Sequence, residues 1–147
     1  MLKVESIRDG VVIDHITAGW GMELYRLLHL EGQQQPVALL QYVRSEKYGR
    51  KDLIKIEGLQ QPGRLDILGY LDPQITLIVI REGQVVKKYR PTPPKVLKNV
   101  VRCRNPRCIT SQEPDCEQIF RLSPGGKYRC IYCNQEISVK NSADFVL

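Results

Sequence analysis

Four of the five cysteines form two closely spaced pairs, Cys103 with Cys108 and Cys130 with Cys133. Each pair can direct two thiolates at one point, and the segment between the pairs lets the second turn fold back onto the first. Four thiolates are a common ligand set of structural zinc, and they leave no coordination position open for a catalytic water. The sequence therefore predicts one structural zinc ion bound by these four cysteines.

Two alternatives to this zinc site remain open at this point. The pairs could form disulfides, which would require an oxidising compartment. Residues 1–5 are charged and lack the apolar segment of a secretory signal, so we expect a cytoplasmic protein with reduced cysteines. Cys116 lies between the pairs and could replace one ligand, although a spare small side chain is the simpler interpretation.

A second group of chemically informative residues lies in the N-terminal half. Lys51 and Lys55 are four residues apart in a segment rich in leucine and isoleucine, so on a strand they share one face with Leu53. A lysine buried among such side chains needs an anion, which indicates a phosphate site. A solvated sheet face with ordinary lysines is the alternative. Lys87 and Lys88, near the end of a later predicted strand, present the same choice.

Asp14 and His15 form a polar pair inside an apolar segment. The carboxylate can accept a hydrogen bond from a ribose hydroxyl, and the imidazole can donate one to a phosphate oxygen. A structural hydrogen-bonded pair is an equally good interpretation. The sequence contains no glycine-rich phosphate loop of the common kinds and no nucleophile with an evident base, so it does not predict an enzyme.

Hydrophobic patterns predict the elements that must position these side chains. We expect strands at 2–7, 11–16, 37–43, 52–57, 75–80 and 85–89, and helices at 17–30 and 62–71. Asp9 and Gly10 form a hairpin-turn signal between the first two strands. This order predicts an α+β fold: a ferredoxin-like two-layer α/β sandwich with two helices and an antiparallel or mixed sheet.

Composition divides the chain into a sandwich domain over residues 1–90, a proline-rich hinge over 91–99 and a small all-β four-cysteine zinc domain over 100–147. A domain as small as the last one seldom folds without a metal. The whole chain has a formal net charge of +6, and residues 90–147 hold ten Lys and Arg against five Asp and Glu. A nucleic-acid-binding zinc-ribbon protein is therefore the main alternative function.

Six segments share their order and spacing with one known family. They are residues 4–16, 49–57, 90–91, 99–103, 105–109 and 130–133. The run over residues 49–57 and the spacing of the cysteines are together the most specific of these features. Over nearly its whole length, the sequence resembles the regulatory chain of aspartate carbamoyltransferase.

The resemblance implies a non-catalytic, allosteric subunit. Its first domain would form a homodimer and bind nucleoside triphosphates, with CTP and UTP inhibiting and ATP activating. Its zinc domain would dock on the catalytic chain and transmit the signal within a dodecamer of two catalytic trimers and three regulatory dimers. The regulated reaction joins carbamoyl phosphate to aspartate in pyrimidine biosynthesis.

The resemblance also implies a set of effector-binding positions. They are Asp14, His15, Lys51, Lys55, Lys88, Ser6, Ile7, Ile80 and Val85. Lys88 would meet the phosphates with the help of His15 and Lys51. Asp14 and Lys55 would lie near the ribose and the base, and the remaining four would provide backbone groups or apolar walls.

Two positions depart from the pattern of well-known members of the family. Ile78 stands where those members have an asparagine near the nucleotide, and Gly83 stands where they have an aromatic residue. Both changes remove groups that could read the base. We therefore expect this chain to separate CTP from ATP less strongly while still binding triphosphates.

Overall fold

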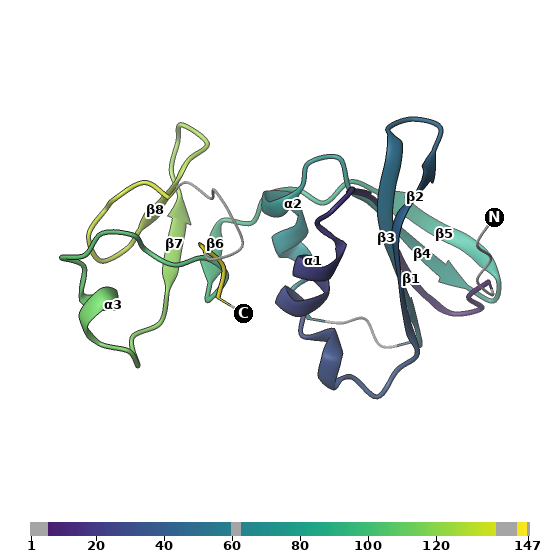
Figure 1. The fold of residues 1–147 in the computed structure, drawn as a ribbon, viewed down its shortest axis with the longest axis horizontal. Helices are drawn as coiled ribbons and strands as arrows, with labels where there is room; N and C mark the ends of the chain where they lie inside the picture. The colour runs from purple at the N-terminus through teal and green to yellow at the C-terminus, as the bar shows by residue number, and fades with distance from the viewer. Residues whose placement is uncertain (1–5, 60–62, 138–143, 147) are drawn as a thin grey trace. The chain divides into compact units, whose positions relative to one another are not determined.

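The computed structural model describes residues 6–59, 63–137 and 144–146, and the chain divides into two compact units, Met1–Pro93 and Pro94–Leu147 (Figure 1). The first unit contains β1 (Gly10–Thr17), α1 (Gly21–Leu27), the 3-10 turn η1 (Leu30–Gly32), β2 (Val37–Ser45), β3 (Gly49–Glu57), the 3-10 turn η2 (Leu65–Ile67), α2 (Leu68–Leu71), β4 (Thr76–Arg81) and β5 (Gln84–Tyr89). The second unit contains β6 (Val96–Lys98), α3 (Ile109–Gln112), β7 (Ile119–Leu122) and β8 (Tyr128–Cys130). Among the described residues, no helix is long and apolar enough to cross a membrane.

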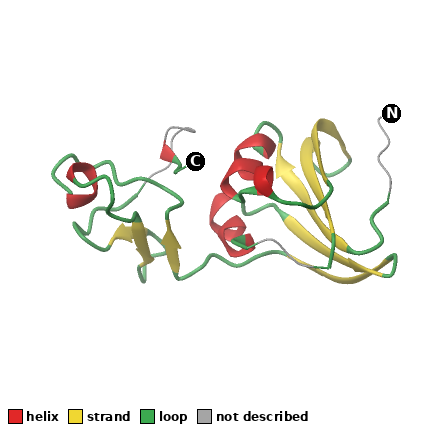
Figure 2. Ribbon diagram, turned by 90° about the horizontal axis from the view of Figure 1, so that it is seen from below, coloured by secondary structure: helices red, strands yellow, loops and turns green. Residues whose placement is uncertain are grey.

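The five strands of the first unit form one antiparallel sheet in the order β2-β3-β1-β4-β5. The first four strands and the two helices follow the βαββαβ order of the ferredoxin-like fold, and β5 adds one strand at an edge. The helices of this unit lie together on one side of the sheet (Figure 2). The predicted α+β sandwich is confirmed, with a wholly antiparallel sheet.

The side of the sheet that faces the helices carries the core of this unit. Ile13 of β1 lies opposite both Ile54 of β3 and Leu77 of β4, and each of the three is at most 1% exposed. Leu24 and Leu27 are the matching buried residues of α1. Directly opposed residues share a face and side chains alternate along a strand, so the neighbours of these residues point to the other side. No described helix covers that other side, which we call the open face.

Asp52 of β3 is a buried carboxylate on the helix-covered side, with no exposed surface. It accepts hydrogen bonds from the backbone amides of Gly19 (3.1 Å), Gly21 (2.9 Å) and Tyr42 (2.8 Å). The amides of Gly19 and Gly21 lie just before and at the start of α1, where helical amides lack partners within the helix. Tyr42 lies where the register between β2 and β3 shifts. One carboxylate therefore fixes the beginning of a helix and an irregular point of a strand.

Both predicted helices are shorter than expected. The helix predicted at 17–30 begins at Gly21, because β1 continues to Thr17 and the amide of Thr17 donates to Asp72 Oδ2 at 2.8 Å. The helix predicted at 62–71 is a 3-10 turn followed by the four residues of α2. Residues 60–62 lie outside the described chain.

The hairpin predicted around Asp9 and Gly10 is wrong. β1 pairs with β3 on one side and with β4 on the other, so no edge of β1 is free for a preceding strand. The carbonyl groups of Arg8 and Asp9 accept hydrogen bonds from the amides of Gly83 and Gly58, each at 2.8 Å. Of the predicted strand at 2–7, residues 2–5 lie outside the described chain, and residues 6–7 are not in a strand.

The second unit is built on a small antiparallel sheet in the order β6-β7-β8. Leu97 of β6 lies opposite Phe120 of β7, and both are at most 1% exposed. The predicted hinge over 91–99 therefore overlaps a strand, since β6 pairs along its length with β7. The segment that ends the described chain joins this unit through an antiparallel bridge between Val101 and Phe145.

Candidate functional site

An irregularity in β1 sets the positions of Asp14 and His15. The register between β1 and β3 shifts between Ile13 and Ile16, and His15 adopts a φ of 59°. Such a bulge inserts an unpaired residue and redirects its side chain, which is why bulges recur beside binding sites. Asp14 still pairs with Thr76 of β4, so its side chain remains on the open face.

Asp14 and Lys51 form a close ion pair, with 2.8 Å between Asp14 Oδ1 and Lys51 Nζ. The same carboxylate oxygen accepts a hydrogen bond from the His15 amide at 2.7 Å. Burial raises the pKa of Asp14, but the hydrogen bonds from Lys51 and the His15 amide and the positive charge of Lys51 outweigh it, so the pKa lies below its usual value. Asp14 is therefore ionised at neutral pH and orients Lys51.

His15 lies among three lysines. Its Nδ1 is 3.2 Å from Thr76 Oγ1, and its ring meets the Tyr48 ring edge-on at 5.6 Å. Burial lowers the pKa of His15, and the charges of Lys51, Lys47 and Lys88 lower it further, against the opposing charge of Asp14. His15 is therefore neutral at pH 7, and the positive charge around it exceeds the negative charge.

Lys55 lies farther along β3, at a second position on the open face. With Ser6 and Ile7 it lines a pocket of about 190 Å³, which Pro36, Val37, Ala38 and Glu57 complete. Lys51 and Lys55 are separated by four residues of strand, which corresponds to about 13 Å. That separation is of the order of the length of an extended nucleoside triphosphate.

The remaining predicted effector residues lie on β4 and β5. Ile78 is opposite Lys88, and Ile80 is opposite Val85, which is 59% exposed. Ile78 is also opposite Val12, which pairs with Lys55. The sheet thus brings the predicted residues to one face in two groups. One group is Asp14, His15 and Lys51, to which Lys88 belongs because its charge acts on His15; the other is Ser6, Ile7 and Lys55, with Ile80 on β4 and Val85 on β5.

Three residues near His15 were not singled out from the sequence. Thr76 and Tyr48 contact its ring, and Gln74 Nε2 donates to its backbone carbonyl at 2.9 Å. Tyr48 directly precedes the run over residues 49–57, so its place in the sequence could have indicated that it lies near the site. Thr76 and Gln74 become neighbours of His15 only through the pairing of β1 with β4, which no local pattern indicates.

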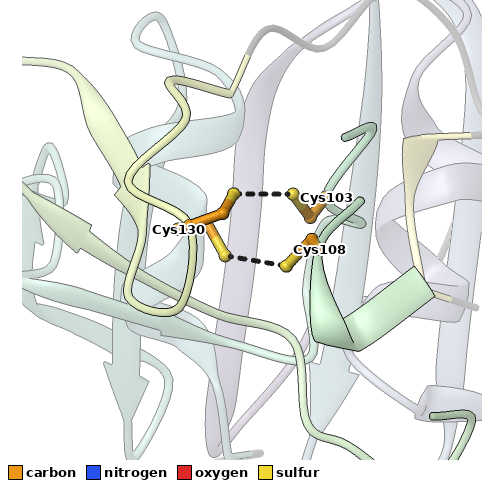
Figure 3. A group of neighbouring side chains, drawn as sticks. Cys103, Cys108 and Cys130 are labelled. Carbon is orange, nitrogen blue, oxygen red and sulfur yellow. Dashed lines mark hydrogen bonds between the residues drawn. The ribbon is translucent and has the colours of Figure 1, made fainter. Parts of the chain in front are cut away.

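The second candidate site is the cysteine cluster of the second unit. All five cysteines are free, and the Sγ atoms of Cys103, Cys108, Cys130 and Cys133 lie within 4.8 Å of one another. Cys103 and Cys133 are 3.6 Å apart and Cys108 and Cys130 are 3.7 Å apart, measured between Sγ atoms. The side chains of Cys103, Cys108 and Cys130 point toward one another (Figure 3).

These distances can be compared with those that a tetrahedral ion requires. With Zn–S bonds of about 2.3 Å, the edges of a regular S₄ tetrahedron measure about 3.8 Å. The cluster therefore has the donor type, the number of donors and the spacing of a closed tetrahedral metal centre. Cys116 is not one of the four clustered cysteines among the described residues.

The environment of the sulfur atoms differs from one cysteine to the next. Burial raises the pKa of Cys103 to about 12 and also raises that of Cys130. Burial also acts to raise the pKa of Cys133, but hydrogen bonds from the Asn105 side chain and the Gln135 amide outweigh it and lower this pKa to about 7. A divalent cation favours the thiolate form of such groups, so metal binding here requires proton release.

Two side chains support the first cysteine pair from outside the cluster. The Cys103 amide donates to Gln118 Oε1 at 2.9 Å, and Gln118 is 8% exposed. The Thr110 hydroxyl donates to Cys108 Sγ at 3.1 Å. Ligand-supporting contacts of this kind are typical of metal centres.

Comparison with known proteins gives the family. The family described as "Aspartate carbamoyltransferase regulatory chain, allosteric domain" matches residues 2–92, and that described as "Aspartate carbamoyltransferase regulatory chain, metal binding domain" matches residues 95–143. A protein of Clostridium botulinum with the name "Aspartate carbamoyltransferase regulatory chain" is 42% identical over 137 residues, which cover 92% of this chain and 93% of the relative.

Relatives from other organisms carry the same name. The protein of Clostridium tetani is 40% identical over 92% of this chain and 95% of its own length, and that of Bifidobacterium longum is 39% identical over 92% and 98%. The two family matches coincide closely with the two structural units, Met1–Pro93 and Pro94–Leu147. The chain belongs to the family of aspartate carbamoyltransferase regulatory chains, with an allosteric domain followed by a metal-binding domain.

Proposed function

We propose that this chain binds nucleoside triphosphates on the open face of its first unit and thereby regulates the catalytic chain of aspartate carbamoyltransferase. The observation that carries this proposal is the cluster of Asp14, His15, Lys51 and Lys88, where positive charge is in excess beside a neutral imidazole. A polyvalent anion is the ligand that such a cluster favours.

The nucleotide extends along β3 from this cluster to the pocket that contains Lys55. Lys88, Lys51 and His15 bind the phosphates, and Asp14 accepts a hydrogen bond from the ribose. Lys55 lies beside the base, with Ser6 and Ile7 lining the same pocket. Ile80 and Val85 provide apolar contacts.

This chain discriminates less strongly between bases than family members with an asparagine at the position of Ile78 and an aromatic residue at the position of Gly83. Ile78 offers no hydrogen-bonding side chain beside Lys88. Gly83 has a φ of 76° in the turn between β4 and β5, where glycine serves the turn geometry. CTP and UTP inhibit and ATP activates, with a smaller difference between them than those members achieve.

The output of the chain is its second unit, held rigid by one zinc ion on Cys103, Cys108, Cys130 and Cys133. That unit docks on the catalytic chain in a dodecamer of two catalytic trimers and three regulatory dimers, in the cytoplasm. A nucleotide shifts the assembly between two states only by its different affinity for them. Couplings of this type are about 1–3 kcal/mol, and here they would control entry into pyrimidine synthesis.

Binding of nucleic acid by the second unit is less well supported. Several of its basic side chains are paired with acidic ones. The pairs are Lys98 with Glu117, Arg104 with Asp144, Lys127 with Glu136 and Arg129 with Glu136. These pairs reduce the charge available for phosphate groups, on which affinity for nucleic acid largely depends.

The proposed function can be tested in a complex of this chain with catalytic trimers. The activity of the complex is measured over a range of aspartate concentrations while each nucleotide is titrated. CTP and UTP should raise the aspartate concentration at half-saturation and ATP should lower it, by factors within the range of about 5 to 150 that such couplings give. Trimers without this chain are the control, because they lack the effector site. A curve unchanged by all three nucleotides in the assembled complex would contradict regulation by triphosphates.

Binding of a triphosphate should also take up protons at His15. The free protein holds the pKa of His15 below its usual value of 6.5, whereas phosphate oxygens beside the ring favour the charged imidazolium. Affinity should therefore rise as the pH falls below 7, by about tenfold for each pKa unit that the ligand restores. Calorimetry in two buffers with different ionisation enthalpies measures this uptake. In His15→Gln, the number of protons taken up on binding should fall by the part that His15 contributes. Equal proton uptake in the wild type and in His15→Gln would refute the role of His15.

A further inference from the structure

Thr110 has a buried side chain beside the cysteine cluster that the proposed function does not use. It is 7% exposed and lies in the short helix α3, directly after the first cysteine pair. A buried hydroxyl must find a hydrogen-bond partner. Among the described residues, the partner of the Thr110 hydroxyl is Cys108 Sγ at 3.1 Å. This hydroxyl therefore donates to a sulfur atom and not to a backbone carbonyl.

The charge of the proposed metal centre gives this contact a chemical meaning. Four thiolates and one divalent ion carry a net charge of about −2, which must be stabilised in a partly buried environment. Backbone amides supply hydrogen bonds to three of the sulfur atoms: the Asn105 amide to Cys103, the Tyr132 and Cys133 amides to Cys130, and the Gln135 amide to Cys133. Cys108 receives the Thr110 hydroxyl.

Cys108 depends on a donor from the protein because it is only 2% exposed. Water therefore has little access to its sulfur atom. Backbone donors are independent of side-chain identity, whereas the hydroxyl that Thr110 donates to Cys108 depends on it. A substitution at Thr110 therefore removes a hydrogen bond from the centre without changing a ligand.

We propose that Thr110 is a positioning residue of the metal centre, whose hydroxyl orients Cys108 Sγ toward the ion and offsets part of the negative charge on that thiolate. The inference rests on the proposed four-cysteine centre. Residues that orient metal ligands in this way commonly change metal affinity by about 10- to 100-fold when they are replaced. Thr110 thus controls how firmly the second unit retains its ion.

The test uses the full chain loaded with Co²⁺, whose thiolate-to-metal charge-transfer bands report on the sulfur ligands. Thr110→Val keeps the shape of the side chain and removes the hydroxyl. We expect its Co²⁺ affinity to fall by about tenfold and its charge-transfer band to move to lower energy, because a sulfur without the hydrogen bond gives up electron density more readily. Thr110→Ser restores the hydroxyl and should return both values to those of the wild type.

Ser111 provides a matched control in the same helix. Its hydroxyl donates to the Asn105 carbonyl at 2.8 Å, whereas that of Thr110 donates to a sulfur atom. Ser111→Ala removes a hydroxyl from the same turn and should leave the charge-transfer band in place. A shift in this variant equal to that of Thr110→Val would overturn the proposal, because the effect would then reflect the turn and not the sulfur contact.

The remaining outcomes are also decisive. A wild-type band in Thr110→Val, or a Thr110→Ser variant that behaves like Thr110→Val, would overturn the role of the hydroxyl. If Thr110→Val does not take up Co²⁺, a wild-type spectrum of Thr110→Ser supports the proposal, and failure of Thr110→Ser to bind the ion overturns it. A wild-type protein without a thiolate charge-transfer band would instead refute the metal centre itself.

Discussion

Replacing Cys108 with serine will deprive the second unit of its metal and its fold while the first unit stays intact. Cys108 is 2% exposed, and its sulfur is 3.7 Å from that of Cys130, so serine cannot supply the fourth thiolate. Structural zinc contributes about 10–16 kcal/mol to small domains, which is as much as the whole stability of a typical protein. The small sheet of β6, β7 and β8 cannot compensate for that loss.

Metal content and amide hydrogen exchange measure this result separately in the two units. Amides of β6, β7 and β8 should lose protection in Cys108→Ser, and those of β1, β3 and β4 should keep it. Cys116→Ser is the matched control, because the same exchange lies outside the clustered sulfur atoms. Gel filtration with catalytic trimers should show no complex for Cys108→Ser and a normal complex for Cys116→Ser. Full metal content and unchanged protection in Cys108→Ser would show that the cluster is not a metal centre.

Lys88→Ala should weaken the binding of a nucleoside triphosphate by about 10- to 150-fold. A hydrogen bond to a charged group contributes about 1.5–3 kcal/mol, and Lys88 is one of the three lysines whose charge acts on His15. Lys55→Ala should also abolish the response to nucleotide, from the other end of the site. Both variants should still bind catalytic trimers, because the second unit is unchanged. Titration calorimetry with CTP and ATP, together with gel filtration, measures both properties.

Lys87 is a suitable control for Lys88 because the two neighbours point to opposite sides of the sheet. Lys88 is opposite Ile78 on the open face, whereas Lys87 is opposite the buried Val79 and its Nζ lies 4.3 Å from the centre of the Tyr89 ring. Lys87→Ala removes the same charge from the same strand and should leave affinity nearly unchanged. Equal losses in the two variants would indicate a general effect of charge, and no loss in Lys88→Ala would refute its contact with phosphate.

The sequence was most informative where chemistry depends on local spacing. The four cysteines cluster as their spacing predicted, because two short turns and one reversal are enough to bring them together. Apart from the hairpin predicted with the first strand, which was wrong, the order of strands and helices in the first unit followed from alternating and helical patterns. Lys51 and Lys55 share the open face, as expected from alternation along a strand.

The sequence was least informative where a residue acts through distant partners. The positive φ of His15 follows from the pairing of β1 with two strands at once, and no residue type marks it. Asp52 looked like the first residue of a strand, but it is a buried acceptor for amides far away in the chain. The late start of α1 has the same origin. These features depend on tertiary pairing, which local propensity does not encode.

The buried carboxylate of Asp52 has a consequence for the interpretation of mutational surveys. A side chain at Gly21 would place its Cβ 2.8 Å from Asp52 Oδ2 and 2.8 Å from Leu39 Cδ1, so Asp52 or the helix would have to move. Asp52 is the chain neighbour of Lys51, and a shift of the carboxylate would pull that lysine away from Asp14. A screen that scores nucleotide response would then record Gly21 as a hit, even though it lies on the side of the sheet away from the proposed nucleotide site. Residues found in such a screen would therefore include those that support the proposed effector site from the other side of the sheet, as well as those that line it.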